Sequence, residues 1–84
     1  MSCNGHSNCV TCCAVFDNDT KAISGSEDKT LKVWDLKDLK TGTCPYVLHT
    51  LTGHYGTVYC CAVFDNDTKA ISGSWDNTLK VWDL

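Results

Sequence analysis

Short apolar runs separated by clusters of polar turn residues make up this chain. The run 9–16 is rich in Val, Cys and Phe, and Asp-Asn-Asp-Thr ends it. Residues 31–36 alternate, so that Leu31 and Val33 share one side and Trp34 and Leu36 the other. No helical spacing of apolar residues is sustained. The pattern predicts antiparallel meanders of short strands, at residues 9–16, 21–26, 31–36, 46–51, 57–64, 69–74 and 79–84.

One segment of the sequence is present twice. Residues 5–36 recur as 53–84, a shift of 48 positions, and only six of the 32 paired positions differ. The differing pairs are Ser7/Tyr55, Asn8/Gly56, Cys9/Thr57, Thr11/Tyr59, Glu27/Trp75 and Lys29/Asn77. Self-similarity at such a period is typical of stacked supersecondary units.

The second repeat has no counterpart of the strand at 46–51. Leu84 corresponds to Leu36, where the first repeat continues into the connector 37–45 and a fourth strand. Repeat units bury their apolar faces only against neighbouring units. We therefore expect two units of 84 residues to be incomplete when alone.

Composition and charge exclude several functional classes. The net charge is −3 and no basic stripe is present, which argues against a nucleic-acid or anionic-membrane role. No apolar run is long enough to span a membrane and no signal-peptide pattern is visible, so a cytoplasmic, intracellular protein is expected. Seven cysteines, an odd number, favour reduced thiols. The pairs Cys12-Cys13 and Cys60-Cys61 are expected to act as small buried hydrophobes.

Gly-His at 5–6 and 53–54, each followed by Trp-Asp 28 positions after its His, resembles the WD40-repeat family. The resemblance covers nearly the whole chain and implies a β-propeller, whose rings have 4–8 four-stranded blades. Here it implies an all-β fold of two antiparallel blades, with four strands and three strands, in an incomplete ring. Residues 1–84 would be a partial WD40 propeller, with a first repeat at 5–52 and a second at 53–84. The spacing of 48 exceeds the usual ~40–45 residues, and we assign the excess to the connector.

The resemblance also implies a buried hydrogen-bonded tetrad in each repeat. A neutral His can donate to an Asp and accept from a Ser, and the Ser oxygen can accept the Trp indole N–H. Ser26 and Ser74 are second-ranked alternatives for the hydroxyl. The implied tetrads are His6, Ser24, Asp28 and Trp34, and His54, Ser72, Asp76 and Trp82.

Several patterns of reactive residues have a simpler structural interpretation. Ser, His and Asp in contact would resemble a catalytic triad, but a triad depends on geometry and roles, and no oxyanion hole is implied. Cys9 and Cys12 have zinc-ligand spacing, but strand alternation separates them and Thr57 replaces Cys9 in the second copy. The Asn-Asp-Thr segments match a glycosylation pattern and carry possible calcium-binding carboxylates, yet fit hairpin turns better. We expect no enzyme activity, metal site or cofactor.

The six differing positions carry the functional signal. In the propeller family these regions lie on one rim that is used for partners, and an exposed Trp beside a Tyr would suit an interaction hot spot. Drift at tolerant loop positions is the alternative. The candidate partner-binding rim consists of Cys9, Thr11, Glu27, Thr57, Tyr59 and Trp75.

The sequence therefore predicts a non-catalytic WD-repeat scaffold for protein–protein interaction. Its expected partners are other proteins at the rim and further WD blades in cis or in trans, with no nucleic acid and no membrane. Two alternatives stay open. The chain could be a truncated fragment of a larger WD-repeat protein, such as a regulatory propeller attached to an enzyme, with no independent function. It could also self-assemble as three or four chains, although the missing fourth strand counts against this because it leaves an unpaired edge.

Overall fold

The computed structural model describes residues 5–37 and 45–84, and within these ranges the chain forms strands and no helix. Predicted and observed strands agree to within one residue at each end. Most of the connector 37–45, and residues 1–4, lie outside the described residues. The strands are β1 (Val10–Phe16), β2 (Lys21–Ser26), β3 (Leu31–Asp35), β4 (Tyr46–Leu51), β5 (Val58–Phe64), β6 (Lys69–Ser74) and β7 (Leu79–Asp83).

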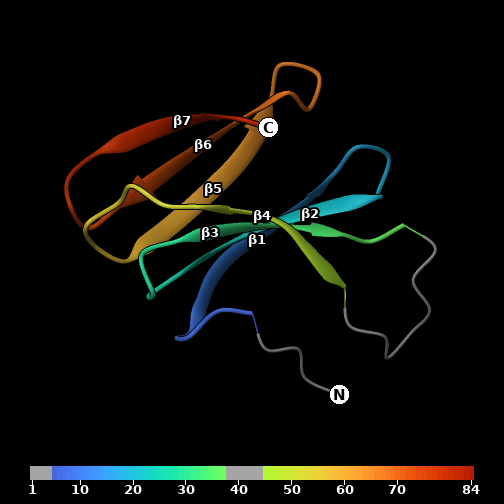
Figure 1. Cartoon of the computed structure of the whole chain (residues 1–84). Helices are drawn as coiled ribbons and strands as arrows, with labels where there is room; N and C mark the ends of the chain where they lie inside the picture. The colour runs from blue at the N-terminus through green and yellow to red at the C-terminus, as the bar shows by residue number, and fades with distance from the viewer. Residues whose placement is uncertain (1–4, 38–44) are drawn as a thin grey trace.

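The strands form two antiparallel sheets, one for each repeat (Figure 1). The first has the order β1-β2-β3-β4 and the second the order β5-β6-β7. This arrangement confirms the predicted all-β fold with four strands in one sheet and three in the other. None of the described residues belongs to a helix that could cross a lipid bilayer.

The hairpin turns before β2 and β6 depend on residues that tolerate a left-handed backbone. Asp17, Asn18 and Asp19 have φ of 55°, 52° and 66°, and the same three residue types repeat this at 65–67. Asn and Asp adopt this conformation more readily than other residues that carry a Cβ. The amide of Thr20 closes the first turn on the carbonyl of Asp17 at 3.1 Å. The Asp-Asn-Asp-Thr segments therefore act as the predicted turns.

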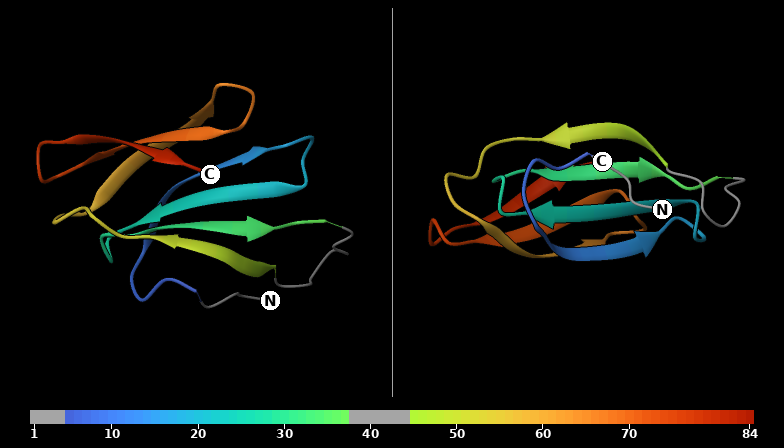
Figure 2. Two further views of the ribbon diagram at one scale, coloured as in Figure 1. Left: turned by 45° about the horizontal axis from the view of Figure 1, so that its top comes forward. Right: turned by 90° about the horizontal axis from the view of Figure 1, so that it is seen from below.

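The two sheets pack face to face, with β1 and β2 of the first sheet against β5 of the second (Figure 2). The sheets approach closely at Gly25, where a Cβ would lie 2.7 Å from Cγ1 of Val58. The amide of Asp17 also donates to Oδ2 of Asp67 at 3.0 Å across the interface. The buried core comprises Phe16, Ile23, Leu31 and Val33 from the first sheet and Val58 and Ala70 from the second.

The vicinal cysteines are only partly the buried hydrophobes that we expected. Cys12 and Cys61 are half-buried between the sheets, with their Sγ atoms 3.1 Å apart. Cys13 and Cys60 are exposed free thiols. Adjacent residues on a strand point to opposite faces, so one member of each pair lies on the sheet face that is turned away from the other sheet.

Candidate functional site

A network of four side chains lies within the first repeat. Nδ1 of His6 lies 2.8 Å from Oδ2 of Asp28, and Nε2 of His6 lies 2.7 Å from Oγ of Ser24. Nε1 of Trp34 donates to the same Ser24 oxygen at 2.8 Å. With the imidazole proton on Nδ1, His6 donates to the carboxylate and accepts from the hydroxyl. Each polar atom of the network is then satisfied.

The strands and turns of the first sheet place these side chains together. Ser24 on β2 and Trp34 on β3 are on neighbouring strands, while Asp28 lies in the turn that joins them. His6 enters from the segment before β1, directly after Gly5. A Cβ at Gly5 would lie 2.1 Å from Cη2 of Trp34, so the backbone crosses the indole ring where only glycine fits. This close approach explains the Gly of the Gly-His pair.

The second repeat contains the same network with nearly the same distances. Nδ1 of His54 lies 3.0 Å from Oδ2 of Asp76, and Nε2 lies 2.7 Å from Oγ of Ser72. The indole N–H of Trp82 donates to Ser72 at 2.8 Å. Ser72 is only 1% exposed, against 7% for Ser24. Within the described residues, no buried side-chain nitrogen or oxygen lacks a hydrogen-bond partner.

Hydrogen bonds hold both network carboxylates in the charged form. Burial by itself would raise the pKa of Asp28, but hydrogen bonds from Thr30, His6 and the Ser7 amide outweigh it and lower the pKa to about 2. Hydrogen bonds from Thr78 and the backbone amide of Tyr55 likewise lower the pKa of Asp76, against the effect of burial. Both turns therefore keep a carboxylate to which the histidine ring can donate.

The alternative hydroxyls have a different role from the tetrad hydroxyls. Oγ of Ser26 accepts the amide of Asp28 at 3.0 Å and donates to the carbonyl of Asn8 at 3.3 Å. Ser74 makes the matching contacts with Asp76 and Gly56, at 3.2 Å and 3.0 Å. These serines tie the turn after β2 or β6 to the loop before β1 or β5. The structure brings Ser24 and Ser72, and not Ser26 and Ser74, to the histidines.

The order Asp28, His6, Ser24 is also the order of groups in a serine-hydrolase triad. The Ser24 hydroxyl is directed at His6, as it would be in a triad. Its oxygen, however, also accepts the indole N–H of Trp34. Ser24 lies inside a strand paired on both sides, so its neighbouring amides belong to the sheet ladders rather than to an oxyanion hole. These contacts favour a structural network. In residues 5–37 and 45–84, no three His, Cys, Asp or Glu side chains are grouped to hold a metal ion.

Tyr59 and Trp75 of the candidate rim lie in contact. Their ring centroids are 5.6 Å apart with the planes tilted by 49°, and Trp75 is 71% exposed. Desolvation, followed by the charge of Glu27, raises the pKa of the Tyr59 hydroxyl. Glu27 from the first repeat is therefore within electrostatic range of Tyr59 from the second. The exposed aromatic pair lies where the repeats meet.

Other rim residues have roles in the backbone framework. The amide of Glu27 donates to the carbonyl of Cys9, and the amide of Trp75 to that of Thr57, each at 3.0 Å. The Thr11 hydroxyl donates to the carbonyls of Gly25 and Val58, so it links the two sheets.

Tyr55 is a highly exposed aromatic side chain that the candidate rim omitted. Its amide donates to Asp76 at 2.9 Å, which places it at the same end of the second sheet as Trp75. It is one of the six differing positions, so the comparison of the two repeats could have identified it.

Comparisons with known proteins agree with this geometry. A family model described as "WD domain, G-beta repeat" matches residues 1–35 and 45–83. Nuclear distribution protein PAC1 of Candida dubliniensis is 52% identical over 40 residues, covering 46% of this chain and 8% of that protein. WD repeat-containing protein 37 of Homo sapiens is 49% identical over 37 residues, covering 44% of this chain and 7% of that protein. The matched segments span less than a tenth of the length of these relatives.

Proposed function

Because the chain belongs to the WD40-repeat family, we propose that it is a non-catalytic scaffold that binds another protein through its rim. WD40 repeats typically serve as protein-interaction scaffolds. In this proposal residues 5–52 form the first repeat with its fourth strand, residues 53–84 form the second, and both belong to a partial propeller. The tetrads stabilise the blades and take no part in chemistry. We place the chain in a reducing compartment such as the cytoplasm, since seven cysteines, an odd number, argue against a fully paired disulfide framework.

The observation that carries the proposal is the exposed contact between Trp75 and Tyr59. Large aromatic side chains with little conformational freedom dominate the energetics of many protein interfaces. The pair is specific to the second repeat, since Glu27 and Thr11 occupy the equivalent positions in the first. The nearby Glu27 charge favours a partner that presents an apolar or basic side chain to the aromatic pair.

Affinity capture with matched variants tests the rim. The 84-residue chain and its Trp75→Ala variant are immobilised and exposed to a lysate of the source organism. Tyr46→Ala is the control, because Tyr46 is an exposed aromatic residue on β4 outside the rim. We expect proteins that bind the wild type and Tyr46→Ala but are lost with Trp75→Ala. Capture that is the same with all three forms would contradict the proposal.

A further inference from the structure

The two sheets contact each other through two different apolar faces. We call the contacting face of the first sheet face A and that of the second sheet face B. Face A consists of Cys12, Ala14, Phe16, Ile23, Leu31 and Val33. Face B consists of Val58, Cys61, Val63, Ala70, Trp82 and Leu84. Each sheet also has an opposite face, which no other described sheet covers; on the first sheet the segment at Gly5 crosses this face, at the indole ring of Trp34.

The uncovered faces repeat faces A and B residue for residue. The uncovered face of the second sheet carries the repeat equivalents of face A: Cys60, Ala62, Phe64, Ile71, Leu79 and Val81. The uncovered face of the first sheet carries the equivalents of face B: Val10, Cys13, Val15, Ala22, Trp34 and Leu36. Each residue on an uncovered face is identical to its equivalent on a covered face, because none of these twelve equivalences falls at one of the six positions that differ between the repeats. The molecule therefore presents a free copy of each half of its own internal interface.

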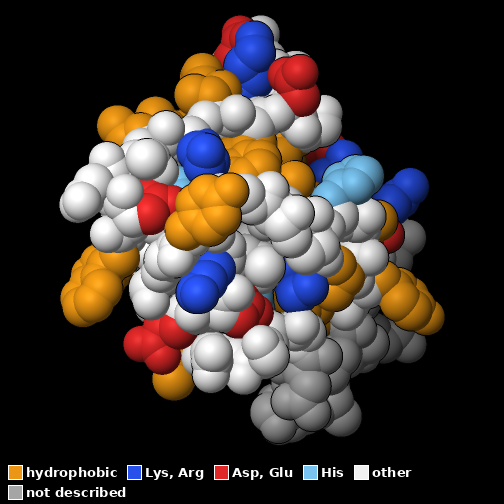
Figure 3. All heavy atoms as spheres, turned by 60° about the vertical axis from the view of Figure 1, so that its left-hand side comes forward, with side chains coloured by type: hydrophobic (Ala, Val, Ile, Leu, Met, Phe, Trp, Pro, Cys, Tyr) orange, Lys and Arg blue, Asp and Glu red, His pale blue; other side chains and the backbone are white. Residues whose placement is uncertain are grey.

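Exposure differs greatly between equivalent residues on covered and uncovered faces. Val58 is 0% exposed and its equivalent Val10 is 55% exposed. Val33 is 2% exposed and its equivalent Val81 is 60% exposed. Figure 3 shows one side of the molecule on which orange apolar side chains project among polar ones. Exposed apolar surface of this extent marks a site of association.

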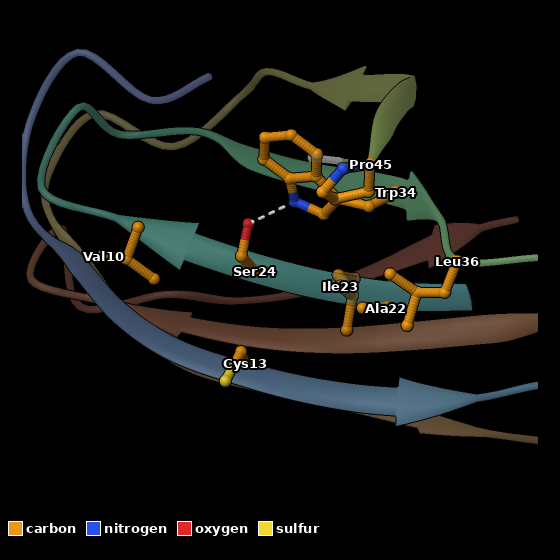
Figure 4. Close-up of a pocket in the computed structure, with 8 residues that line it drawn as sticks. All are labelled: Val10, Cys13, Ala22, Ile23, Ser24, Trp34, Leu36 and Pro45. Atoms are coloured by element: carbon orange, nitrogen blue, oxygen red, sulfur yellow. Dashed lines mark hydrogen bonds between the residues drawn. The ribbon is translucent and has the colours of Figure 1, made fainter. Parts of the chain in front are cut away.

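A hollow of about 270 Å³ lies on the uncovered face of the first sheet (Figure 4). Val10 and Cys13 of β1 line it, together with Trp34 of β3. In the second sheet the equivalent residues lie beneath the first sheet, as members of face B. The chain itself thus shows which surface fits over this hollow, namely a sheet carrying face A.

We propose that a second copy of this chain covers these surfaces in a head-to-tail arrangement. The free face A on the second sheet of one copy packs on the free face B on the first sheet of the next copy. This contact is heterologous, because each copy uses a different surface. It repeats from copy to copy and closes into a ring when the rotation between copies permits.

The missing fourth strand of the second repeat does not prevent this contact. Inside the chain, the contact between the sheets is concentrated between β1 and β5 and between β2 and β5. The equivalent strands for a contact between copies are β5 and β6 of one copy and β1 of the next, and all are present. Glu27, Tyr59 and Trp75 belong to neither face, so this proposal and the proposed rim can fail independently.

The cysteines allow the inter-copy contact to be trapped. Cys12 and Cys61 lie with their Sγ atoms 3.1 Å apart inside the chain, and their equivalents in the contact between copies are Cys60 and Cys13. The parent variant replaces the other cysteines: Cys3→Ser, Cys9→Ser and Cys44→Ser. Diamide takes two electrons and two protons from a thiol pair and leaves a disulfide.

Non-reducing electrophoresis then shows which thiols have formed disulfides between copies. We expect covalent multimers of the parent variant that disappear with Cys13→Ser. They persist when Cys12→Ser and Cys61→Ser together remove the pair inside the chain. Absence of multimers, or multimers that survive Cys13→Ser, would overturn the proposal.

Charged substitutions on the two free faces test the head-to-tail polarity. Leu79→Asp disables the free face A and Val10→Asp the free face B, while Tyr46→Asp on β4 is the control. All three residues are exposed in the single chain, and circular dichroism checks that the variants fold. We expect wild type and Tyr46→Asp to associate in sedimentation velocity, each face variant alone to remain a monomer, and the two face variants mixed to form a 1:1 pair. A monomeric wild type, face variants that still self-associate, or a mixture that does not pair would each overturn the proposal.

Discussion

Leu31 and Leu79 occupy the same position in two strands of identical sequence, yet Leu31 is fully buried and Leu79 is 71% exposed. The strands around them have the same register with β2 and β6. Leu31 lies in the core between the sheets and is paired with Leu51 of β4, whereas β7 is the last strand of its sheet and no described residue covers the face on which Leu79 lies. Burial in this molecule is set by the neighbouring strands and sheet more than by local sequence.

Replacement of His54 tests the buried network of the second repeat. His54→Ala leaves the Asp76 carboxylate and the Ser72 hydroxyl without their imidazole partner. A lost partner of a buried polar group costs about 1–3 kcal/mol, so we expect the free energy of unfolding to fall by that amount. Urea denaturation followed by circular dichroism measures it. His49→Ala on β4 is the control, because His49 is exposed and lies outside the network. Equal unfolding midpoints for the two variants would contradict the structural role.

The depressed pKa of Asp28 predicts a loss of stability in acid. The pKa falls from 3.8 to about 2 in the folded chain, so the charged carboxylate favours the folded state at pH values above the unfolded pKa. This contribution decreases as the pH falls below about 4 and is lost as it passes through about 2. Asp76 acts in the same direction.

Urea midpoints measured between neutral pH and pH 2 check this dependence. We expect the midpoint of Asp28→Asn to change less with pH than that of wild type, and Asp83→Asn, at an exposed carboxylate, to follow wild type. Identical pH profiles for wild type and Asp28→Asn would show that this carboxylate is not responsible.

Gly25 and Gly73 provide a matched test of the contact between the sheets. A Cβ at Gly25 would lie 2.7 Å from both Sγ of Cys12 and Cγ1 of Val58, so Gly25→Ala forces the sheets apart. Overpacking of this kind costs about 1–3 kcal/mol. A Cβ at Gly73 would meet only Sγ of the exposed Cys60 at 2.9 Å and Leu79 at 3.4 Å, and these side chains can move.

We therefore expect Gly73→Ala to lower the unfolding midpoint less than Gly25→Ala. The comparison is made in dilute protein, since Gly73 would lie in the contact between copies at higher concentration. Equal losses for the two variants would contradict a close sheet–sheet approach at Gly25.

Lys29 and Asn77 occupy the same left-handed turn position, with φ of 75° and 69°. Asn tolerates this conformation and Lys does so less readily. We expect Lys29→Asn to stabilise the fold by about 0.5–1 kcal/mol and Asn77→Lys to destabilise it by a similar amount. Thermal unfolding of the two variants measures the pair of shifts. Shifts of the same sign would be inconsistent with a backbone origin.

The strands and turns could be predicted because the sequence encodes them locally. Alternation at Leu31 to Leu36 and the Asp-Asn-Asp-Thr turns require only period-two patterning and residue preferences for the left-handed region. The residues of each network could also be predicted, because the family resemblance implied the pairing of His6 with Asp28 and the repeat carried it over to the second copy. Which cysteine of each pair is exposed was not predictable. That depends on which sheet faces find a neighbour.

The effect of the Glu27 charge on the pKa of Tyr59 across the repeats likewise could not be predicted from the sequence. Sequence comparison identified both as variable positions but gave no relation between them. The link arises because β1 and β2 pack face to face against β5, which brings the turn of one sheet near the strand of the next. Tertiary placement of this kind is set by the sheet interface and not by either segment alone.

Sedimentation velocity of the 84-residue chain over about a hundredfold range of concentration tests most directly the claim that its outer faces require further sheets. The account predicts a mass that rises with concentration beyond that of a dimer. A compact chain of 9.2 kDa that remains monomeric across the whole range would contradict it.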